Sequence, residues 1–167
     1  MDPTEKVFKA YDIRGIYGKG IDEDLAWKVG HASAQFLRGL LSGNERGLAS
    51  ANRSVVGQDM RPSGRALQEA LIEGITSTGA GCTVLGMVDT PMVYFAINHL
   101  GACGGIQITA SHNPPEYNGF KISGAKARPV GENTGLKEIQ HIVSTLRRMP
   151  AAASMAGVQQ VDLWGEY

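Results

Sequence analysis

Hydrophobic residues recur at helical spacing in four segments of this chain. The first predicted helix begins after Asp22, a residue suited to cap it, and runs to about Leu41. Its apolar face carries Leu25, Val29, Phe36, Leu37 and Leu40. Three further helices are predicted at about residues 65–78, 90–100 and 134–149. In the helix near residue 90, Thr90 is placed to cap the first turn and Pro91 occupies its first position.

Short apolar runs separate these segments and predict β-strands. The four runs lie at residues 54–57, 82–88, 105–109 and 120–123. Strands that alternate with helices favour a parallel sheet with helices on both faces. The last two runs have no helix between them, so one strand is expected to be antiparallel. The pattern therefore predicts an α/β fold, a three-layer α/β/α sandwich with a small mixed, mostly parallel sheet.

A chain of 167 residues is long enough for one domain with a core of its own. The alternating pattern ends near Pro150, where an alanine-rich stretch begins. The apolar residues after that stretch are followed by no helical pattern. We therefore assign residues 1–150 to one domain, and residues 151–167 to a linker or to the first segment toward a second domain.

Charge and hydropathy exclude several classes of protein. Lys plus Arg and Asp plus Glu both total 16, so the net charge is zero and no basic field favours nucleic acid. No apolar run reaches the roughly 18–20 residues that a membrane span needs, and the first residues lack the core of a signal peptide. We therefore expect a cytoplasmic protein, with Cys82 and Cys103 as reduced thiols. Three histidines without metal-ligand spacing are interpreted as structural: His31, His99 and His141.

A polar loop at residues 110–119 follows the predicted strand at 105–109, the place where ligands bind in open α/β sheets. It holds a hydroxyl, an imidazole and two carboxamides, and two consecutive prolines stiffen it. An ordinary surface loop has a similar composition, so both interpretations stay open on composition alone. A hydrolase triad through Ser111 and His112 is disfavoured, because adjacent side chains rarely face each other and no Gly-x-Ser-x-Gly elbow surrounds the serine.

A second use of the Ser111 hydroxyl is covalent, as a phosphoserine. A phosphoryl group brings nearly two negative charges and three acceptor oxygens, so it needs cations nearby. The candidates are Lys121, at the start of the next predicted strand, and Arg14 near the N-terminus. Each of them, taken alone, also fits an ordinary surface cation. The Gly-x-x-x-x-Gly-Lys signature of nucleotide-binding loops does not occur.

Two segments resemble the α-D-phosphohexomutase family. Residues 109–121, Thr-Ala-Ser-His-Asn-Pro-Pro-Glu-Tyr-Asn-Gly-Phe-Lys, are similar to the family's phosphoserine loop. Residues 8–15, Phe-Lys-Ala-Tyr-Asp-Ile-Arg-Gly, are similar to its N-terminal segment. Residues 57–61 and 89–92 are weaker matches in the expected order. The resemblance covers about residues 7–148 and is strongest to the bacterial phosphomannomutase/phosphoglucomutase branch.

This resemblance implies a mechanism and a set of site residues. Ser111 would donate a phosphoryl group to a hexose phosphate and take the other phosphate back from the hexose 1,6-bisphosphate, so that phosphate moves between C1 and C6 of glucose or mannose. Arg14 would hold the transferring phosphoryl group, and Lys121 and His112 would serve acid–base and electrostatic roles. Mg²⁺ would bind a phosphoserine oxygen of Ser111. The residues that would line the substrate site are Tyr11, Asn113 and Asn118.

The sequence departs from the family in extent. Family members have four domains, this chain resembles the first, and the second domain's metal loop, Asp-Gly-Asp-x-Asp-Arg, does not occur in it. Ser111 offers one of about six Mg²⁺ ligands, so a weak metal site and little or no turnover are expected from this chain alone. The implied partners are a hexose phosphate and the other domains of the same protein. Two alternatives stay open: a module that grips an anion with this loop without phosphoryl transfer, and a stand-alone regulatory subunit.

Overall fold

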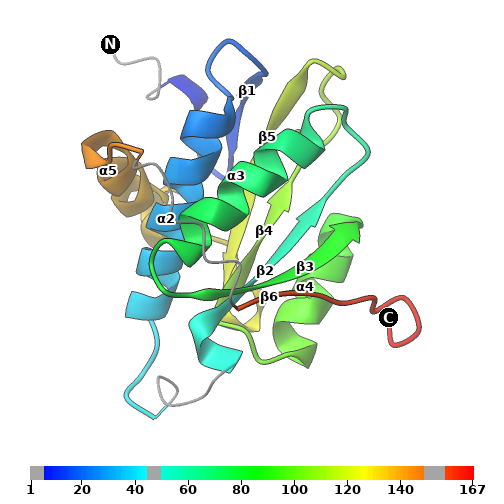
Figure 1. Ribbon diagram of the computed structural model, residues 1–167. Coiled ribbons are helices and arrows are strands. Elements are labelled where there is room, and N and C mark those ends of the chain that lie inside the picture. Colours follow the sequence, from blue (N-terminus) through cyan, green and yellow to red (C-terminus); the bar gives the residue numbers. More distant parts are fainter. Residues whose placement is uncertain (1–5, 45–49, 149–156) are drawn as a thin grey trace.

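A six-stranded mixed sheet with helices on both faces forms this protein (Figure 1). The computed structural model describes residues 6–44, 50–148 and 157–167. The strands are β1 (Ile13–Ile16), β2 (Arg53–Gln58), β3 (Gly81–Met87), β4 (Gly104–Ile108), β5 (Tyr117–Gly124) and β6 (Val158–Gln160). The helices are α2 (Glu23–Gly39), α3 (Gly64–Thr76), α4 (Thr90–His99) and α5 (Lys137–Thr145). Short helical turns are η1 (Ser50–Asn52), η2 (Ala125–Ala127) and η3 (Glu132–Leu136).

The order of the strands across the sheet is β1-β5-β4-β2-β3-β6. The four strands β4, β2, β3 and β6 are parallel, and β5 is antiparallel to both β4 and β1. Helices α2 and α3 cover one face of the sheet and α4 covers the other (Figure 1). The α/β/α sandwich and its antiparallel strand, both predicted from the sequence, are therefore confirmed.

The two edge strands were not predicted as part of this sheet. Strand β1 pairs with β5, so the segment that holds Arg14 lies directly against the strand that follows the loop at residues 110–119, called the serine loop below. Strand β6 falls in the segment expected to be a linker or a first strand toward a second domain, and it pairs with β3 here. The proposed boundary near residue 150 stays a prediction, because residues 149–156 lie outside the described part of the chain.

Three predicted helix ends are wrong, and one of them is the end of the last helix, which lies at Thr145 instead of about residue 149. Asp89, rather than Thr90, caps α4: its Oδ1 accepts the Met92 N–H at 2.9 Å, and its extended backbone lets the carboxylate reach that amide. The last helix does not run unbroken from residue 134. The turn η3 precedes α5, because Gly135 has a φ of 130°, which is not helical. A Cβ at this position would lie 2.0 Å from the Phe36 ring, so the close contact with Phe36 requires glycine.

Glycines let α2 and α3 approach to backbone contact. A Cβ added at Gly74 in α3 would lie 2.0 Å from the Trp27 carbonyl oxygen in α2. A Cβ at Gly30 in α2 would lie 2.2 Å from the Leu71 carbonyl oxygen in α3. Neither backbone atom can move aside as a side chain can. The layer that supports one face of the sheet therefore depends on the absence of side chains at these two positions.

Cys82 lies in the apolar core between this helical layer and the sheet, with no exposed surface. Burial raises the pKa of the Cys82 thiol from an ordinary 9.0 to about 12, and the nearby Arg53 charge only partly opposes this. The folded thiol keeps its proton where the unfolded thiol has lost it. The contribution of Cys82 to stability is therefore present below about pH 9 and is lost as the pH rises toward 12.

The measurement is urea unfolding of the protein and of Cys82→Ala between about pH 8 and about pH 10. Removing the thiol leaves a cavity, so Cys82→Ala is less stable at both pH values. The difference in unfolding free energy between the two proteins is expected to shrink as the pH rises. A difference that stays constant or grows would contradict the buried, protonated thiol.

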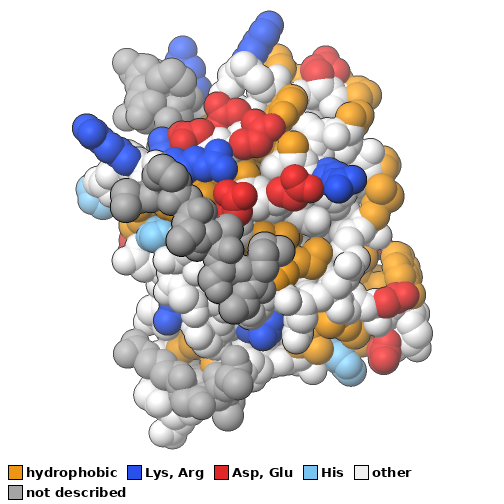
Figure 2. Space-filling model, viewed as in Figure 1, with side chains coloured by type: hydrophobic (Ala, Val, Ile, Leu, Met, Phe, Trp, Pro, Cys, Tyr) orange, Lys and Arg blue, Asp and Glu red, His pale blue; other side chains and the backbone are white. Residues whose placement is uncertain are grey.

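Charged side chains of both signs are mixed on the α2–α3 face. Figure 2 shows acidic and basic side chains next to one another there, instead of a single basic field. Three ion pairs join residues on or next to these helices: Lys28–Asp24 at 2.7 Å, Arg65–Glu69 at 3.1 Å and Arg148–Glu73 at 3.0 Å. This arrangement is typical of a solvent-facing helical layer. Among the described residues, no helix has the length and hydrophobicity needed to cross a membrane.

Candidate active site

The serine loop lies at the carboxyl edge of the parallel strands. Strand β4 ends at Ile108, and the chain returns along β5 from Tyr117. The turn after β2 lies beside it, because the Asp59 N–H donates to the Ile108 carbonyl at 3.0 Å. The loop predicted at residues 110–119 therefore occupies the edge where open α/β sheets bind ligands.

Ser111 has a strained backbone and a hydroxyl without a partner in the part of the chain that the structure describes. Its φ is 54°, a left-handed conformation that costs a residue with a side chain about 1–2 kcal/mol. Its N–H donates to Thr109 Oγ1 at 2.9 Å, and that hydroxyl donates to Asp59 Oδ2 at 2.6 Å. The residue is half-buried, and its own hydroxyl makes no hydrogen bond with the described residues. Strain at a residue with an uncommitted hydroxyl is typical of functional sites.

The buried side chain of Arg61 holds the serine loop through hydrogen bonds. Its side chain is 8% exposed, and it donates to backbone carbonyls at four positions of the loop. Its Nε lies 3.2 Å from Asp59 Oδ2. Sequence reasoning placed Arg61 only within a weak family match at residues 57–61 and gave it no role, because nothing in the local sequence shows which distant carbonyls a buried arginine reaches.

A cationic hollow of about 410 Å³ adjoins the loop. It is lined by Arg14 of β1, by Asn113 and Tyr117 of the loop, and by three lysines, Lys6, Lys9 and Lys19. The Arg14 side chain is 33% exposed, and its Nε lies 3.8 Å from Asp12 Oδ1. This long, partly solvated contact leaves the guanidinium positioned to meet an anion in the hollow.

The sheet register brings Arg14, Lys121 and the serine loop together. Arg14 lies opposite Gly119 of β5, and the Thr109 N–H donates to the Gly119 carbonyl from the other side at 3.0 Å. Lys121 follows Gly119 by two residues, so it projects from the same face of the sheet as Arg14. Lys121 is half-buried, and its amine has no hydrogen bond or ion pair with the described residues. It lies in the middle of β5, opposite Gln107, rather than at the strand start as predicted.

The remaining predicted site residues divide into exposed and buried ones. His112 is exposed, and Tyr11 is 83% exposed. Asn113 lines the hollow, with its Nδ2 donating to the Ala110 carbonyl at 2.9 Å. Asn118 is fully buried and donates to Ser63 Oγ at 2.9 Å. Asn118 thus lies beneath the loop and connects it to the start of α3, instead of lining the site.

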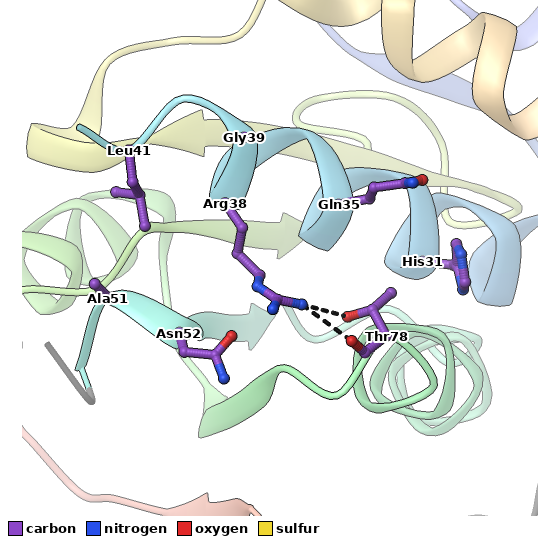
Figure 3. Close-up of a pocket in the computed structure, with 8 residues that line it drawn as sticks. All are labelled: His31, Gln35, Arg38, Gly39, Leu41, Ala51, Asn52 and Thr78. Carbon is purple, nitrogen blue, oxygen red and sulfur yellow. Dashed lines mark hydrogen bonds between the residues drawn. The ribbon is translucent and has the colours of Figure 1, made fainter. Parts of the chain in front are cut away.

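A second and larger hollow, of about 660 Å³, lies elsewhere (Figure 3). Its cation, Arg38, donates through Nη1 to the Thr78 carbonyl at 3.0 Å and to Thr78 Oγ1 at 3.4 Å. Asn52 and Thr78 come before β2 and β3, so this hollow is at the amino ends of the parallel strands. The serine loop is at their carboxyl ends. The two hollows are therefore separate, and of the two only the smaller one is lined by residues of the serine loop, Asn113 and Tyr117.

The residues around Ser111 do not form a magnesium site by themselves. No group of three or more His, Cys, Asp or Glu side chains able to hold a metal ion occurs in residues 6–44, 50–148 and 157–167. The carboxylate beside the loop, Asp59, already accepts from Arg61 and Thr109. Among the described residues Ser111 remains the candidate ligand, so further Mg²⁺ ligands would have to come from outside them.

Comparison with known proteins places this architecture in a family. The model of the "Phosphoglucomutase/phosphomannomutase, alpha/beta/alpha domain I" family matches residues 5–148. The chain belongs to the phosphoglucomutase/phosphomannomutase family. The resemblance recognised in the sequence is therefore confirmed, and the match covers β1 to β5 together with the serine loop and Arg14.

Relatives and a solved structure agree with this assignment. A phosphomannomutase of Escherichia coli K12 is 38% identical over 161 residues, which make up 96% of this chain and 33% of that protein. A phosphoglucomutase of Neisseria meningitidis is 40% identical over 164 residues, 96% of this chain and 32% of that protein. A phosphoglucomutase/phosphomannomutase family structure from Burkholderia thailandensis covers the whole chain with a TM-score of 0.80 at 30% identity, over 35% of its own length. This chain thus spans about a third of the length of these relatives.

Proposed function

We propose that this chain is the phosphoserine-bearing domain of a hexose-phosphate mutase, and that Ser111 carries the phosphoryl group between C1 and C6 of glucose or mannose. The observation that carries the proposal is the Ser111 hydroxyl: it has no partner among the described residues and belongs to a fixed, strained loop beside a hollow with four cationic side chains. The names of the family relatives support the reaction class.

The transfer proceeds in two balanced halves. In the first, a hydroxyl oxygen of the hexose phosphate attacks the phosphorus on Ser111, the Ser111 Oγ–P bond breaks, and a hexose 1,6-bisphosphate forms. The proton of that hydroxyl ends on Ser111 Oγ. In the second half the bisphosphate turns round, Ser111 Oγ attacks the other phosphorus, and the released sugar oxygen takes the serine proton. Phosphate has then changed position with no net consumption of phosphoryl donor.

Three residues take roles in this scheme. Arg14 faces the hollow and is assigned to hold the transferring phosphoryl group through two N–H donors. Lys121 projects from the same face of the sheet as Arg14. It is assigned to stabilise the negative charge that develops on the oxygens of the transferring phosphoryl group. His112 is exposed next to Ser111 and is assigned an acid–base and electrostatic role toward the sugar phosphate.

This chain by itself is not expected to complete the reaction. The described residues offer one Mg²⁺ ligand, and the relatives extend over about three times this length. The choice between glucose and mannose is assigned to parts of the protein beyond the match. A cytoplasmic location stays a prediction from the sequence.

Intact mass and peptide mapping test the proposal. The full-length protein is exposed to glucose 1,6-bisphosphate, and one added phosphoryl group is expected on the peptide that contains Ser111. Ser111→Ala is expected to take up none, whereas Ser144→Ala, which removes an exposed hydroxyl on α5, is expected to be labelled like the unaltered protein. If phosphate binds but never labels Ser111, the loop serves only to grip an anion, and the proposed phosphoryl transfer is wrong.

A further inference from the structure

We infer that Arg61 is a positioning residue for phosphoryl transfer: it holds Ser111 in its reactive conformation through the backbone of the serine loop, without contacting the sugar phosphate. This inference rests on the function proposed above. It concerns a residue 50 positions before the serine, and it is carried by contacts between the two segments.

Every N–H of the Arg61 guanidinium has a protein acceptor. Nη2 donates to the Ser111 and Asn113 carbonyls at 2.9 and 2.7 Å. Nη1 donates to the Pro114 and Tyr117 carbonyls at 2.6 and 2.8 Å, and Nε donates to Asp59 Oδ2 at 3.2 Å. A guanidinium has five donors, and all five are used here. No donor remains for a substrate phosphate, so Arg61 acts on the loop.

The loop depends on this external donor because it makes few hydrogen bonds of its own. Pro114 and Pro115 have no N–H. The backbone bonds inside the loop are Asn113 N–H to the Ala110 carbonyl and Tyr117 N–H to the Pro114 carbonyl. The four carbonyls bound by Arg61 extend over the whole turn, from Ser111 to Tyr117. Without Arg61, these partly buried acceptors would have to find water, and the turn would lose the contact that closes it.

Arg61 also fixes Ser111 from its amide side. The Ser111 N–H is held by Thr109 Oγ1, whose proton goes to Asp59 Oδ2. The same carboxylate oxygen accepts from Arg61 Nε. The other oxygen, Asp59 Oδ1, accepts from the backbone N–H of Arg61 at 3.1 Å. The amide and the carbonyl of Ser111 are therefore tied to one Asp59–Arg61 pair. Held at both ends, Ser111 keeps its φ of 54° against the strain, which fixes where its Oγ points.

The geometry predicts that the shape of the guanidinium matters as well as its charge. A lysine keeps the positive charge but concentrates its donors on one atom, so it cannot reach four carbonyls and a carboxylate at once. Arg61→Lys should therefore leave the loop loosely held. Reaction geometry is sensitive to such loosening, because a displacement of about 1 Å can slow a reaction by about 100-fold.

The experiment compares Arg61→Lys and Arg61→Ala in the full-length protein. Arg65→Lys is the matched control, because Arg65 is an exposed arginine of the same segment that pairs only with Glu69 among the described residues. The single-turnover rate of Ser111 phosphorylation is measured against glucose 1,6-bisphosphate concentration. The saturating rate is expected to fall about 10- to 100-fold in the Arg61 variants, while the half-saturating concentration changes by less than about threefold. Arg65→Lys is expected to match the unaltered protein.

Hydrogen exchange gives a second measurement that needs no sugar phosphate. Amides of residues 111–119 are expected to exchange faster in Arg61→Lys, while amides of α2 and α3 keep their protection. This measurement keeps the inference testable if Arg61→Ala does not fold. Added guanidinium at low concentration is expected to restore part of the rate of Ser111 phosphorylation in Arg61→Ala. It is expected to restore no phosphorylation in Ser111→Ala.

Each outcome bears on one claim. If the unaltered protein takes up no phosphate at Ser111, the proposed function fails and this inference fails with it. If the unaltered protein is loaded and Arg61→Lys is loaded at the same saturating rate, only the role of Arg61 is wrong. A raised half-saturating concentration with an unchanged saturating rate would mean that Arg61 binds the sugar phosphate, and it would also overturn the inference.

Discussion

A glycine in place of Ser111 is expected to abolish mutase turnover and, at the same time, to give a more stable protein than an alanine in the same place. Both variants lack the hydroxyl, so turnover is expected to fall by at least about 10⁴-fold in each. Their stabilities differ because φ at this position is 54°. The left-handed conformation is strained for alanine but not for glycine, so the glycine variant is expected to be more stable by about 1 kcal/mol.

Two measurements on the full-length protein check this result: conversion of hexose 1-phosphate to hexose 6-phosphate, and urea unfolding of each variant. The matched control is Ser144 in α5, where the backbone is helical. There the order of stability should reverse, with glycine about 1 kcal/mol less stable than alanine, and turnover should not change. Equal stability of the two Ser111 variants would contradict the strain, and turnover in either of them would contradict the role of the hydroxyl.

The largest effect on stability is expected from Gly74→Ala. Its Cβ would lie 2.0 Å from the Trp27 carbonyl oxygen and 2.9 Å from the His31 nitrogen, both on the backbone of α2. Because a backbone cannot rotate out of the way, α2 and α3 must separate along their length and leave gaps in the core. We expect a loss of about 3 kcal/mol, at the upper end of what overpacking usually costs.

Gly39→Ala is the control for this prediction. Gly39 is the last residue of α2, and a Cβ there meets no heavy atom within 4 Å. Alanine is a better helix former than glycine, so this change is expected to be neutral or to stabilise by up to about 1 kcal/mol. Thermal or urea unfolding of both variants decides the matter. A Gly74→Ala protein as stable as Gly39→Ala would show that the two helices are not held in backbone contact.

The helices were predictable from the sequence because their burial pattern is local. Apolar spacing in the segment after Asp22 shows where α2 begins, and the structure confirms that Asp22 Oδ1 accepts the Leu25 N–H at 2.8 Å. Edge strands carry no such local pattern. Strand β1 has one fully buried residue, Ile13, and β6 has none among its three. What makes each of them a strand is a neighbour far away in the sequence, so the pairing becomes visible only in the folded chain.

The candidate site also contains residues that the sequence indicated and residues whose positions it did not indicate. Ser111 and Arg14 were identified from their chemistry and from motif resemblance. In the structure Arg14 lies opposite Gly119, and Thr109, two residues before Ser111, donates to the Gly119 carbonyl from the other side. The buried position of Asn118 was not predicted, since an asparagine in a turn looks the same in sequence whether it faces solvent or supports a helix start. Arg61 was missed as a site residue, because its effect depends on acceptors brought to it by the fold.

The pairing of β1 with β5 also determines when the site is assembled. The segment with Arg14 is synthesised before the other strands of this sheet, and its partner strand, which holds Gly119, is synthesised only after β2, β3 and β4. Contacts between such distant segments form late, since a long loop must close before they contribute. Arg14 can therefore reach the serine loop only after β2, β3 and β4 have been synthesised. A nascent chain would contain Ser111 before Gly119 is available to pair with the Arg14 segment.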